Sequence, residues 1–539
     1  ITFNIPWLAV GDTAIPFGFV LDPLTGAMAA MVTFVGLLIF IYSAGYMKND
    51  ERMARFFCYL SLFAAGMLGL VLANSLLLLF MCWEIVGLAS YLLISFWFHK
   101  PEAAAAGKKA FIVTRIGDLG FLIGILLIFK STGTLTLYGP ESIFGTGDDP
   151  TLLVKTVMGV TLAKWASLLL FAGAIGKSGQ LPLHVWLPDA MEGPTPVSAL
   201  IHAATMVAAG VFLVARAIPL FEAGGTLPVV AWVGATTALV AAFIALGQYD
   251  LKRILAYSTV SQLGLMMVGL GVAGVSVGMF HLLTHAFFKA VLFLTCGAIM
   301  HGFAGQLDLR KLSGLRKMKG WKIVSYTMLI GCLCLAGFPL TSGYFSKDAI
   351  LAEAFVSQGT GFQFLGWLAI FTAGLTAYYT FRVWFRVCCG PVQFEPGDEL
   401  HGDDASSFHP HAPRIVINFV LVVIALGALL ATLPYFMPNE TEGLHGGWIA
   451  EMVNDSPAAA GVPHSIVDAG SHLESGHEAV DGTILGMDPH VAMYYISAVV
   501  GFIGIGLALY FHLFFRSSAD KLRGKLLSSR TTRWLPTAM

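Results

Sequence analysis

Long apolar runs recur along almost the whole chain, and most of them are close to 20 residues long. A helix of about 20 residues is as long as the hydrocarbon core of a bilayer is thick, roughly 30 Å. Backbone polar groups in hydrocarbon need partners within the protein, so uninterrupted runs of this length favour helices over barrel strands. The pattern predicts thirteen spans, near residues 24–46, 55–75, 76–98, 109–130, 162–189, 196–220, 227–247, 254–273, 275–301, 321–356, 363–388, 414–436 and 491–515.

Two of these runs, 162–189 and 321–356, are too long and too interrupted to form single straight helices. Each contains a Pro-Leu pair, a lysine close to it, and an Asp-Ala pair further along: Lys177, Pro182 and Asp189 in the first, Pro339, Lys347 and Asp348 in the second. Proline removes a helix donor and breaks the hydrogen-bond ladder. Matching interruptions in two halves of a membrane chain indicate inverted repeats with an ion site near the midplane.

The composition agrees with a membrane protein. The 539 residues are 57% hydrophobic and 12% charged, about half the charged fraction of a soluble domain. The seven cysteines lie in or at the ends of apolar runs, without a paired CxxC ligand set, and no glycine fingerprint for a dinucleotide follows a strand. Buried apolar thiols are the simpler interpretation. We therefore expect no redox centre, cofactor or metal on this chain.

Charge in the loops predicts how the chain is oriented. Alternate loops carry the basic residues Lys48, Arg52, Arg55, Lys100, Lys108, Lys109, Lys252, Arg253, Arg310, Lys311, Arg316, Lys317, Lys319 and Lys322, and the tail adds Arg516, Lys521, Arg523 and Lys525. The other loops are nearly free of Lys and Arg; the largest, 437–490, has none and nine acidic residues. The positive-inside rule then places the basic loops in the cytoplasm.

Two polar segments, 394–412 and 437–490, are rich in Gly, Pro, Asp, Glu and His and are predicted to be loops. Their histidines show no recurring ligand spacing: His401, His409, His411, His445, His464, His472 and His477. A solvated loop is therefore favoured over a metal site in both segments.

Ionisable residues inside the spans are the candidates for function, because a charge near the bilayer centre costs at least ~2.5–3.5 kcal/mol. They are Glu84, Arg115, Asp118, Lys177, His202, His281, His285, Lys289, Lys347 and Asp348. The spacing of His281, His285 and Lys289 (i, i+4, i+8) places them on one stripe of a helix, which favours a functional role. Simpler readings stay open for others: Arg115 with Asp118 as a structural pair on one helix face, and His202 as a satisfied core histidine.

Proton relay is the chemistry that this set of residues suits. A lysine in a low-dielectric site releases its proton more readily, and a nearby carboxylate opposes the release. A change in the distance between Glu84 and Lys177 would therefore switch Lys177 between holding and releasing a proton. Histidines titrate near neutral pH and can pass protons through bound water. By contrast, Lys164 and Arg216, near helix ends, are expected to extend to the membrane interface.

Several stretches resemble the antiporter-like subunits of respiratory complex I, and specifically the L subunit (mitochondrial subunit 5). They are RFF at 55–57, WEIVGLASYLLI at 83–94, KAFIVTRIGD at 109–118, GPTPVSALIHAATM at 193–206, HAFFKA at 285–290 and GYFSKD at 343–348. The resemblance covers nearly all of 20–390. It matches Glu84 and Lys177 to the family's ion pair, His202 and the His281/His285/Lys289 stripe to its central polar axis, and Lys347 to the lysine of the second broken helix.

The resemblance implies an all-α polytopic membrane protein of about 13 transmembrane helices with two inverted five-helix repeats, each with a broken helix. The expected division is 1–54 with one span, 55–220 as the first repeat, 221–390 as the second, and 391–539 with the last spans and the polar loops. It also implies proton translocation in an energy-transducing membrane, bacterial inner or organellar. Quinone reduction elsewhere in the complex would drive it, with FMN, iron–sulfur clusters and quinone on partner subunits.

Family members begin with two further spans and continue past the tail with a lateral helix and an anchoring span. We expect these segments to have been left out of this chain or to be supplied separately. The implied partners are other membrane-arm subunits and lipid, with no nucleic acid.

Other function classes remain open at this point. One is the large subunit of a multisubunit Na⁺/H⁺ antiporter, and another is a proton-path subunit of an inorganic-carbon uptake complex. A non-pumping scaffold is disfavoured by the number of buried charges. Co-purifying flavin and iron–sulfur subunits would distinguish a complex I subunit from the antiporter.

Overall fold

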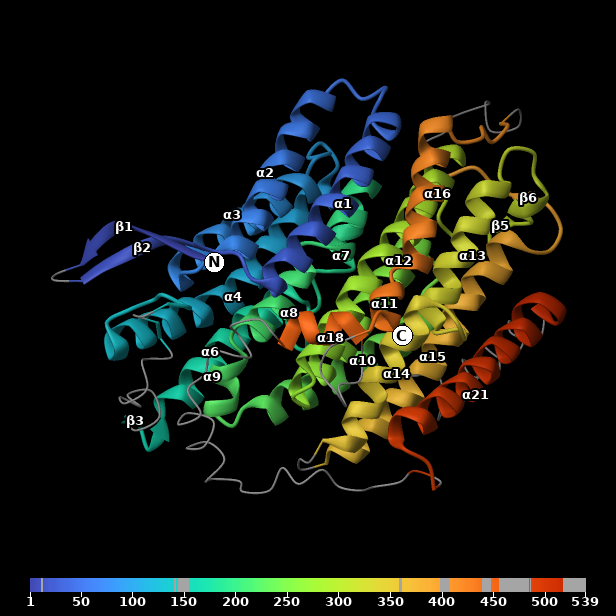
Figure 1. The fold of residues 1–539 in the computed structure, drawn as a ribbon. Coiled ribbons are helices and arrows are strands. Elements are labelled where there is room, and N and C mark those ends of the chain that lie inside the picture. The colour runs from blue at the N-terminus through green and yellow to red at the C-terminus, as the bar shows by residue number, and fades with distance from the viewer. Residues whose placement is uncertain are drawn as a thin grey trace, which may run out of the picture.

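The computed structural model describes residues 1–10, 13–139, 142–143, 155–357, 361–397, 408–438, 447–454, 484 and 486–516. Within these ranges the protein is a bundle of long, mostly parallel or antiparallel helices (Figure 1). Eleven helical segments are long and apolar enough to cross a membrane. The chain is an integral membrane protein.

Eleven of the thirteen predicted spans match these segments. They are α1 (Pro23–Tyr46), α2 (Met53–Leu72), α3 (Leu76–Ile94), α4 (Pro101–Thr132), α7 with α8 (Thr195–Ala203 and Met206–Arg216), α10 (Leu227–Gly247), α11 (Leu251–Gly271), α12 (Val275–Gly302), α15 (Phe362–Cys388), α16 with α17 (Ile415–Leu430 and Leu433–Phe436), and α21 with the π-helix η4 (Pro489–Leu509 and Tyr510–Phe514). The structure therefore does not show thirteen continuous membrane-spanning helices among the described residues. The other two predicted spans, 162–189 and 321–356, are interrupted.

Both of those spans break close to their prolines. In the first, α6 (Leu162–Lys177) ends at the lysine, and turns and the 3-10 helix η1 (Asp189–Glu192) follow before α7 begins. In the second, α13 (Lys322–Ala336) and α14 (Ser342–Val356) are separated by five residues that include Pro339. Free carbonyl groups at such helix ends need side-chain partners. The interruptions therefore bring polar contacts into the bundle.

A third break falls inside a span predicted to be ordinary. The segment 195–216 divides into α7 and α8 at Ala204 and Thr205, directly after His202. The Thr205 hydroxyl donates to the carbonyl oxygen of Leu200 at 2.6 Å, so one of the freed carbonyls keeps a partner. No proline or glycine marks this point in the sequence, which is why the pattern did not predict it.

Strands β1 (Thr2–Val10) and β2 (Thr13–Val20) pair as an antiparallel hairpin that projects from one side of the bundle (Figure 1). The sequence analysis missed it, although Gly11-Asp12 between two apolar runs is a usual hairpin signal. Asn74, after α2, anchors the hairpin by donating from Nδ2 to Asn4 Oδ1 at 3.0 Å.

The polar segments contain more regular structure than the sequence predicted. Strand β6 (Gln393–Phe394) pairs with β5 (Leu312–Ser313), and helix α18 (Gly447–Asn454) packs against α12 and α17 inside the predicted loop 437–490. The limits 54/55 and 220/221 fall inside α2 and α9 (Ile218–Ala223). His401, His445, His464, His472 and His477 lie outside the described residues, as does the tail beyond Arg516.

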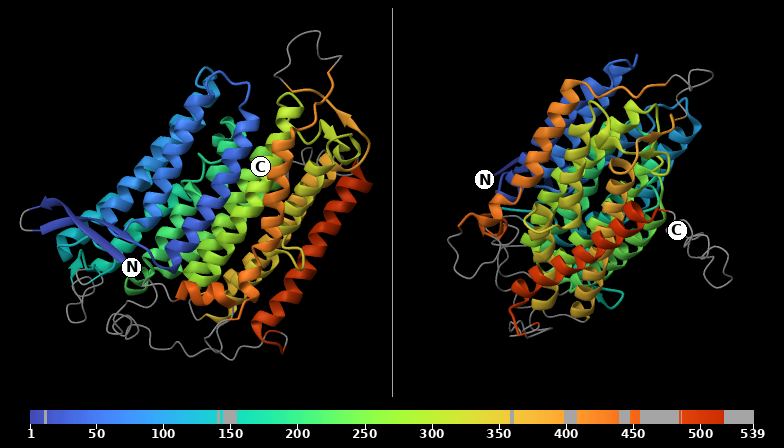
Figure 2. Two further views of the ribbon diagram at one scale, coloured as in Figure 1. Left: turned by 45° about the horizontal axis from the view of Figure 1, so that its top comes forward. Right: turned by 90° about the vertical axis from the view of Figure 1, so that its right-hand side faces the viewer.

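Helices α7, α8, α11 and α12 form the centre of the bundle, and the other long helices surround them. In the most apolar stretch of each central span, 89–100% of the residues are buried. Helix α21, by contrast, lies along one edge of the bundle (Figure 2). The outer helices present large apolar side chains outward, for example Ile112, Ile116 and Leu119 of α4. Such a surface suits lipid or another apolar membrane helix.

One buried ion pair joins the start of the first span to the end of α8. Arg216 Nη1 lies 2.5 Å from Asp22 Oδ2, and Arg216 Nη2 donates to Asp22 Oδ1 at 3.1 Å and to Thr25 Oγ1 at 2.5 Å. Asp22 also caps α1 by accepting from the Thr25 N–H at 2.8 Å. The expectation that Arg216 extends to the interface is therefore wrong, because its side chain is buried.

Removing one member of this pair should destabilise the protein strongly. We expect Asp22→Ala to cost about 3–5 kcal/mol, because it leaves a buried guanidinium uncompensated. The double variant Asp22→Ala/Arg216→Met should recover much of that loss. Thermal denaturation of the membrane-embedded protein measures both. Equal melting temperatures for wild type and Asp22→Ala would show that the pair contributes nothing.

Candidate functional site

The first group of predicted residues meets where α3, α4 and α6 pack together. Lys177, in the last turn of α6, places Nζ 3.2 Å from Asp118 Oδ2 on α4, and both side chains are buried. The indole Nε1 of Trp83 donates to the other oxygen, Asp118 Oδ1, at 2.6 Å. Asp118 therefore has a lysine on one oxygen and an indole on the other.

A glycine makes this approach possible. A Cβ built on Gly87 of α3 would lie 2.5 Å from Lys177 Nζ, so a side chain at this position would displace the ammonium group of Lys177. The Lys177 ammonium also lies 5.9 Å from the centre of the Trp83 ring, a distance at which a cation is attracted to the face of an aromatic ring. Gly87 and Trp83 thus form the α3 wall of the lysine site.

Glu84 is not the partner of Lys177 in this structure. Its carboxylate pairs with Arg115 of α4, whose guanidinium also lies 4.4 Å from the centre of the Phe111 ring. The two side chains are 18% and 34% exposed, so this pair faces the side of the bundle. Arg115 and Asp118 share a helix but each is paired with a different helix, and the simple intrahelical pair is therefore not found.

The central group lies on α12 and the end of α7. His202, two residues before the break in its span, is buried, its ring 4.8 Å from that of Phe293 on α12. Neither ring nitrogen of His202 has a hydrogen-bond partner among the described residues. His285 is buried on α12, and neither of its ring nitrogens has a hydrogen-bond partner among the described residues either. The α7 break therefore faces the histidine stripe.

His281 and Lys289, at the two ends of that stripe, have well-defined polar partners. His281 Nδ1 lies 2.9 Å from Ser346 Oγ on α14, and its Nε2 lies 3.2 Å from Gln262 Oε1 on α11. Lys289 Nζ donates to the Leu255 carbonyl at 3.2 Å and to the Ser258 hydroxyl, both on α11. Lys289 forms no ion pair within the described part of the chain. Its partners there are neutral.

Lys347 and Asp348 occupy the second turn of α14. Lys347 Nζ donates to the carbonyl oxygen of Leu335, in the last turn of α13. The interruption between α13 and α14 thus provides the acceptor that the buried ammonium needs. Asp348 is 2% exposed, and its Oδ2 accepts no hydrogen bond from the described residues.

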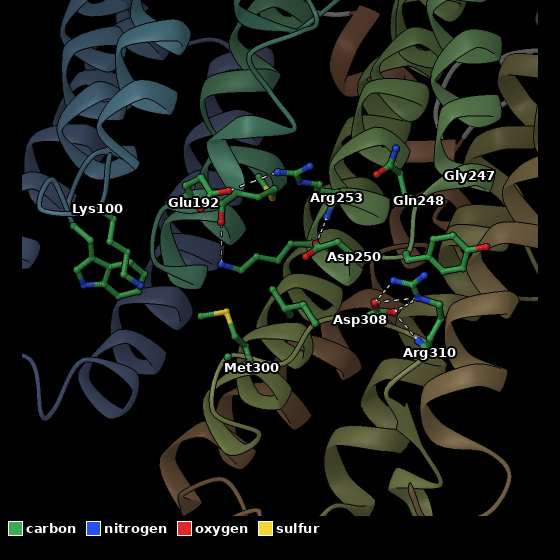
Figure 3. A pocket seen from close by; sticks show the side chains of 15 residues that line it. Lys100, Glu192, Gly247, Gln248, Asp250, Arg253, Met300, Asp308 and Arg310 are labelled. Atoms are coloured by element: carbon green, nitrogen blue, oxygen red, sulfur yellow. Dashed lines mark hydrogen bonds and ion pairs between the residues drawn. The ribbon is translucent and has the colours of Figure 1, made fainter. Parts of the chain in front are cut away.

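A cavity of about 670 Å³ opens among the loops that carry the basic residues (Figure 3). Arg253 points toward Glu192, with 3.7 Å between Nη2 and Oε1, and Arg310 pairs with Asp308. Asp250 caps α11 and accepts from the Arg253 N–H at 2.9 Å. Burial raises the pKa of the Asp250 carboxyl despite that bond and the cations beside it, so this carboxyl binds a proton more readily than an exposed aspartate.

The cavity meets the central helices at Lys252. Its Nζ donates to the carbonyl oxygens of Met191 and Gly193, at 3.2 and 3.1 Å. Lys252 lies in the first turn of α11, one to two turns before Leu255 and Ser258, which hold Lys289. Among the described residues, no group of three or more His, Cys, Asp or Glu side chains is arranged to hold a metal ion.

Comparison with known families decides the identity of this architecture. Residues 73–376 match the family described as "NADH:quinone oxidoreductase/Mrp antiporter, TM", and residues 7–57 match "NADH-Ubiquinone oxidoreductase (complex I), chain 5 N-terminus". This chain belongs to the NADH:quinone oxidoreductase/Mrp antiporter family. The resemblance to subunit 5 found in the sequence is confirmed.

Two of the relatives carry the name of the same kind of enzyme. The chain is 49% identical over 395 residues to "NAD(P)H-quinone oxidoreductase subunit 5, chloroplastic" of Anthoceros angustus, covering 71% of this chain and 52% of that protein. It is 43% identical over 454 residues to "NAD(P)H-quinone oxidoreductase chain 5" of Picosynechococcus sp., covering 80% and 66%. The chain thus spans about half to two thirds of the length of these relatives.

A solved structure shares the fold. The "Structure of Mrp complex from Dietzia sp. DQ12-45-1b" aligns with a TM-score of 0.74 at 27% identity, over 98% of this chain and 55% of that one. The membrane architecture of the family therefore extends across nearly the whole chain, including the spans after residue 376.

Sequence reasoning missed the neutral partners of the ionisable residues. Trp83, Gln262, Ser258 and Ser346 all bind predicted site residues. One signal was available for α11, since this apolar span carries several hydroxyl and amide side chains, among them Ser258, Ser261 and Gln262. Hydroxyl and amide side chains in a fully enclosed span indicate a polar interior.

The pairing of Lys177 can be tested by two double-mutant cycles on thermal stability. We expect Asp118→Asn and Lys177→Met to be coupled by about 1–3 kcal/mol, because the two groups are in contact. Glu84→Gln and Lys177→Met should be additive within about 0.5 kcal/mol. The reverse ranking would show that Glu84 is the resting partner of Lys177.

Proposed function

We propose that this chain is the proton-translocating membrane subunit of a complex I-type NAD(P)H-quinone oxidoreductase. The observation that carries the proposal is the line of buried ionisable side chains through the centre of the bundle, Lys177, His202, His281, His285, Lys289 and Lys347. Charges placed at this depth are costly and are retained where they do work. The names of the relatives supply the enzyme.

The central members of this line act on one another electrostatically. His202 interacts with Lys289, His281 interacts with both Lys289 and Lys347, and the two lysines interact with each other. Like charges this close do not ionise independently. A proton that arrives on one group therefore favours release from the next, which is how a relay moves charge in one direction when one end is driven.

The α3–α4–α6 cluster is suited to be the driven end. Arg115 and Asp118 lie three residues apart on α4, and Arg115 now pairs with Glu84. If Arg115 moved to Asp118, Lys177 would share its carboxylate with a second cation and would release its proton more readily. The Glu84–Arg115 pair is partly exposed, at 18% and 34%, on the side of the bundle, where a neighbouring subunit can disturb it.

His202 supports a hydrated path between these groups. Buried polar atoms in proteins nearly always have a partner, and ordered water supplies it where protein does not. The two free ring nitrogens of His202, beside the α7 break, are suitable positions for such water. The cavity at Lys252 provides access from the basic face, which we place in the cytoplasm.

In this proposal the chain carries no redox centre. The flavin, the iron–sulfur clusters and the quinone site belong to partner subunits, together with the other membrane-arm subunits. The second candidate is the large subunit of a cation/proton antiporter, which the likeness to the Mrp complex supports. The two differ in one observable: an antiporter exchanges a cation for protons without a quinone reductant.

The proposal predicts that variants at buried lysines lose proton pumping, whereas a variant at an exposed lysine keeps it. Lys177→Ala, Lys289→Ala and Lys347→Ala should each lower redox-driven proton pumping in membrane vesicles by at least about tenfold, because each removes a group that accepts and donates the proton. Lys164→Ala is the control, since Lys164 lies on α6 with Lys177 but is exposed. Unchanged pumping by Lys177→Ala and Lys347→Ala would refute the proposal. Pumping that needs a sodium gradient and no quinone would favour the antiporter.

A further inference from the structure

Three tyrosines surround the end of the buried line at Asp348, and they come from three different helices. Tyr344 lies one turn before Asp348 on α14, Tyr435 is on α17, and Tyr494 is on α21. The hydroxyl oxygens of Tyr435 and Tyr494 are 2.7 Å apart. Tyr344 donates its hydroxyl to the backbone oxygen of Tyr494 at 2.6 Å.

Exposure increases along this cluster. Asp348 is 2% and Tyr344 8% exposed, whereas Tyr435 and Tyr494 are half-buried. Helix α17 ends its span, and α21 begins, on the side of the bundle opposite the basic loops. The polar groups therefore run from the enclosed carboxylate outward to that opposite face.

The carboxylate of Asp348 is within electrostatic range of the Tyr344 and Tyr435 hydroxyls. Ser497, one helical turn after Tyr494 on α21, lies close enough to Asp348 to act on its carboxyl, although the Ser497 hydroxyl has no hydrogen-bond partner among the described residues. Residues three apart on a helix share a face, so Tyr494 and Ser497 lie on the same face of α21. Helix α21 thus supplies two hydroxyl groups in succession between Asp348 and the outside.

Apolar rings pack beside the hydroxyl pair. The Tyr435 ring stacks on Phe280 of α12 at 5.2 Å and on Phe345 of α14 at 5.8 Å, and Phe436 packs against Phe345 at 4.8 Å. A hydrogen-bonded hydroxyl pair within an aromatic wall passes protons but resists a continuous water column. It has the features of a gate.

We propose that Tyr435 and Tyr494 form the outer gate of the proton path, linking Asp348 to the face opposite the basic loops. A tyrosine hydroxyl can accept a proton on its oxygen and give up the proton it already holds, after which the group rotates back. One proton enters and one leaves, and no covalent bond of the protein changes. The C-terminal spans, beyond residues 73–376 of the family match, thereby contribute working residues to the path.

This inference rests on the proposed function and can fail separately from it. Tyr435→Phe and Tyr494→Phe keep the rings and remove one hydroxyl each. In vesicles that contain the assembled complex, each should lower the rate of proton release about tenfold. The double variant should be no slower than the worse single one, because the hydroxyls act as a pair. The solvent isotope effect on the rate should rise, because proton transfer becomes the slow step.

Tyr495→Phe is the matched control, because Tyr495 is the neighbouring residue on α21 and is 63% exposed. Tyr435→Phe and Tyr494→Phe variants that pump like Tyr495→Phe would overturn the gate. A loss of pumping that only follows a loss of assembled complex, with an unchanged isotope effect, would overturn it too. If Lys347→Ala also pumps normally, the proposed function itself fails. If Lys347→Ala is inactive but both phenylalanine variants pump normally, only the proposed gate fails and the proposed function stands.

Discussion

Every buried cation in this bundle needs a partner, and the partners are either carboxylates or neutral acceptors. Arg216 has an anionic partner, with two hydrogen bonds to Asp22 and one to Thr25. Lys289 and Lys347 have neutral acceptors, a hydroxyl and backbone carbonyls. Neutral acceptors hold an ammonium without compensating its charge. A lysine held this way can lose its proton and keep its place.

The helix interruptions supply much of this polar environment. A straight helix in a bilayer uses all of its carbonyls internally, whereas a broken one leaves some free. The end of α13, for example, provides the Leu335 carbonyl to Lys347. The same breaks remove regular structure where two helices would otherwise pack tightly. The breaks therefore reduce helix packing at the same points where they allow charged side chains to be held inside the bundle.

Much of this architecture follows from the sequence, and the rest depends on which helices touch. Apolar runs and prolines located the spans and two of the breaks, and the cost of buried charge selected the candidate residues. Spacing assigns a residue to a helix face but not to a neighbouring helix. Asp118 rather than Glu84 beside Lys177, and Asp22 beside Arg216 at a separation of 194 residues, were therefore out of reach. The break after Ala203 carries no proline or glycine and was equally hidden.

The central claim is that protons move along a hydrated line of buried side chains, and direct observation of water tests it most directly. An experimental density map of the assembled complex, sharp enough to show ordered water, should place water on the free ring nitrogens of His202 and between His202, His285 and Lys289. We expect water molecules to form a hydrogen-bonded chain there in at least one state of the working enzyme. A dry, closely packed interior at His202 in every state would contradict it.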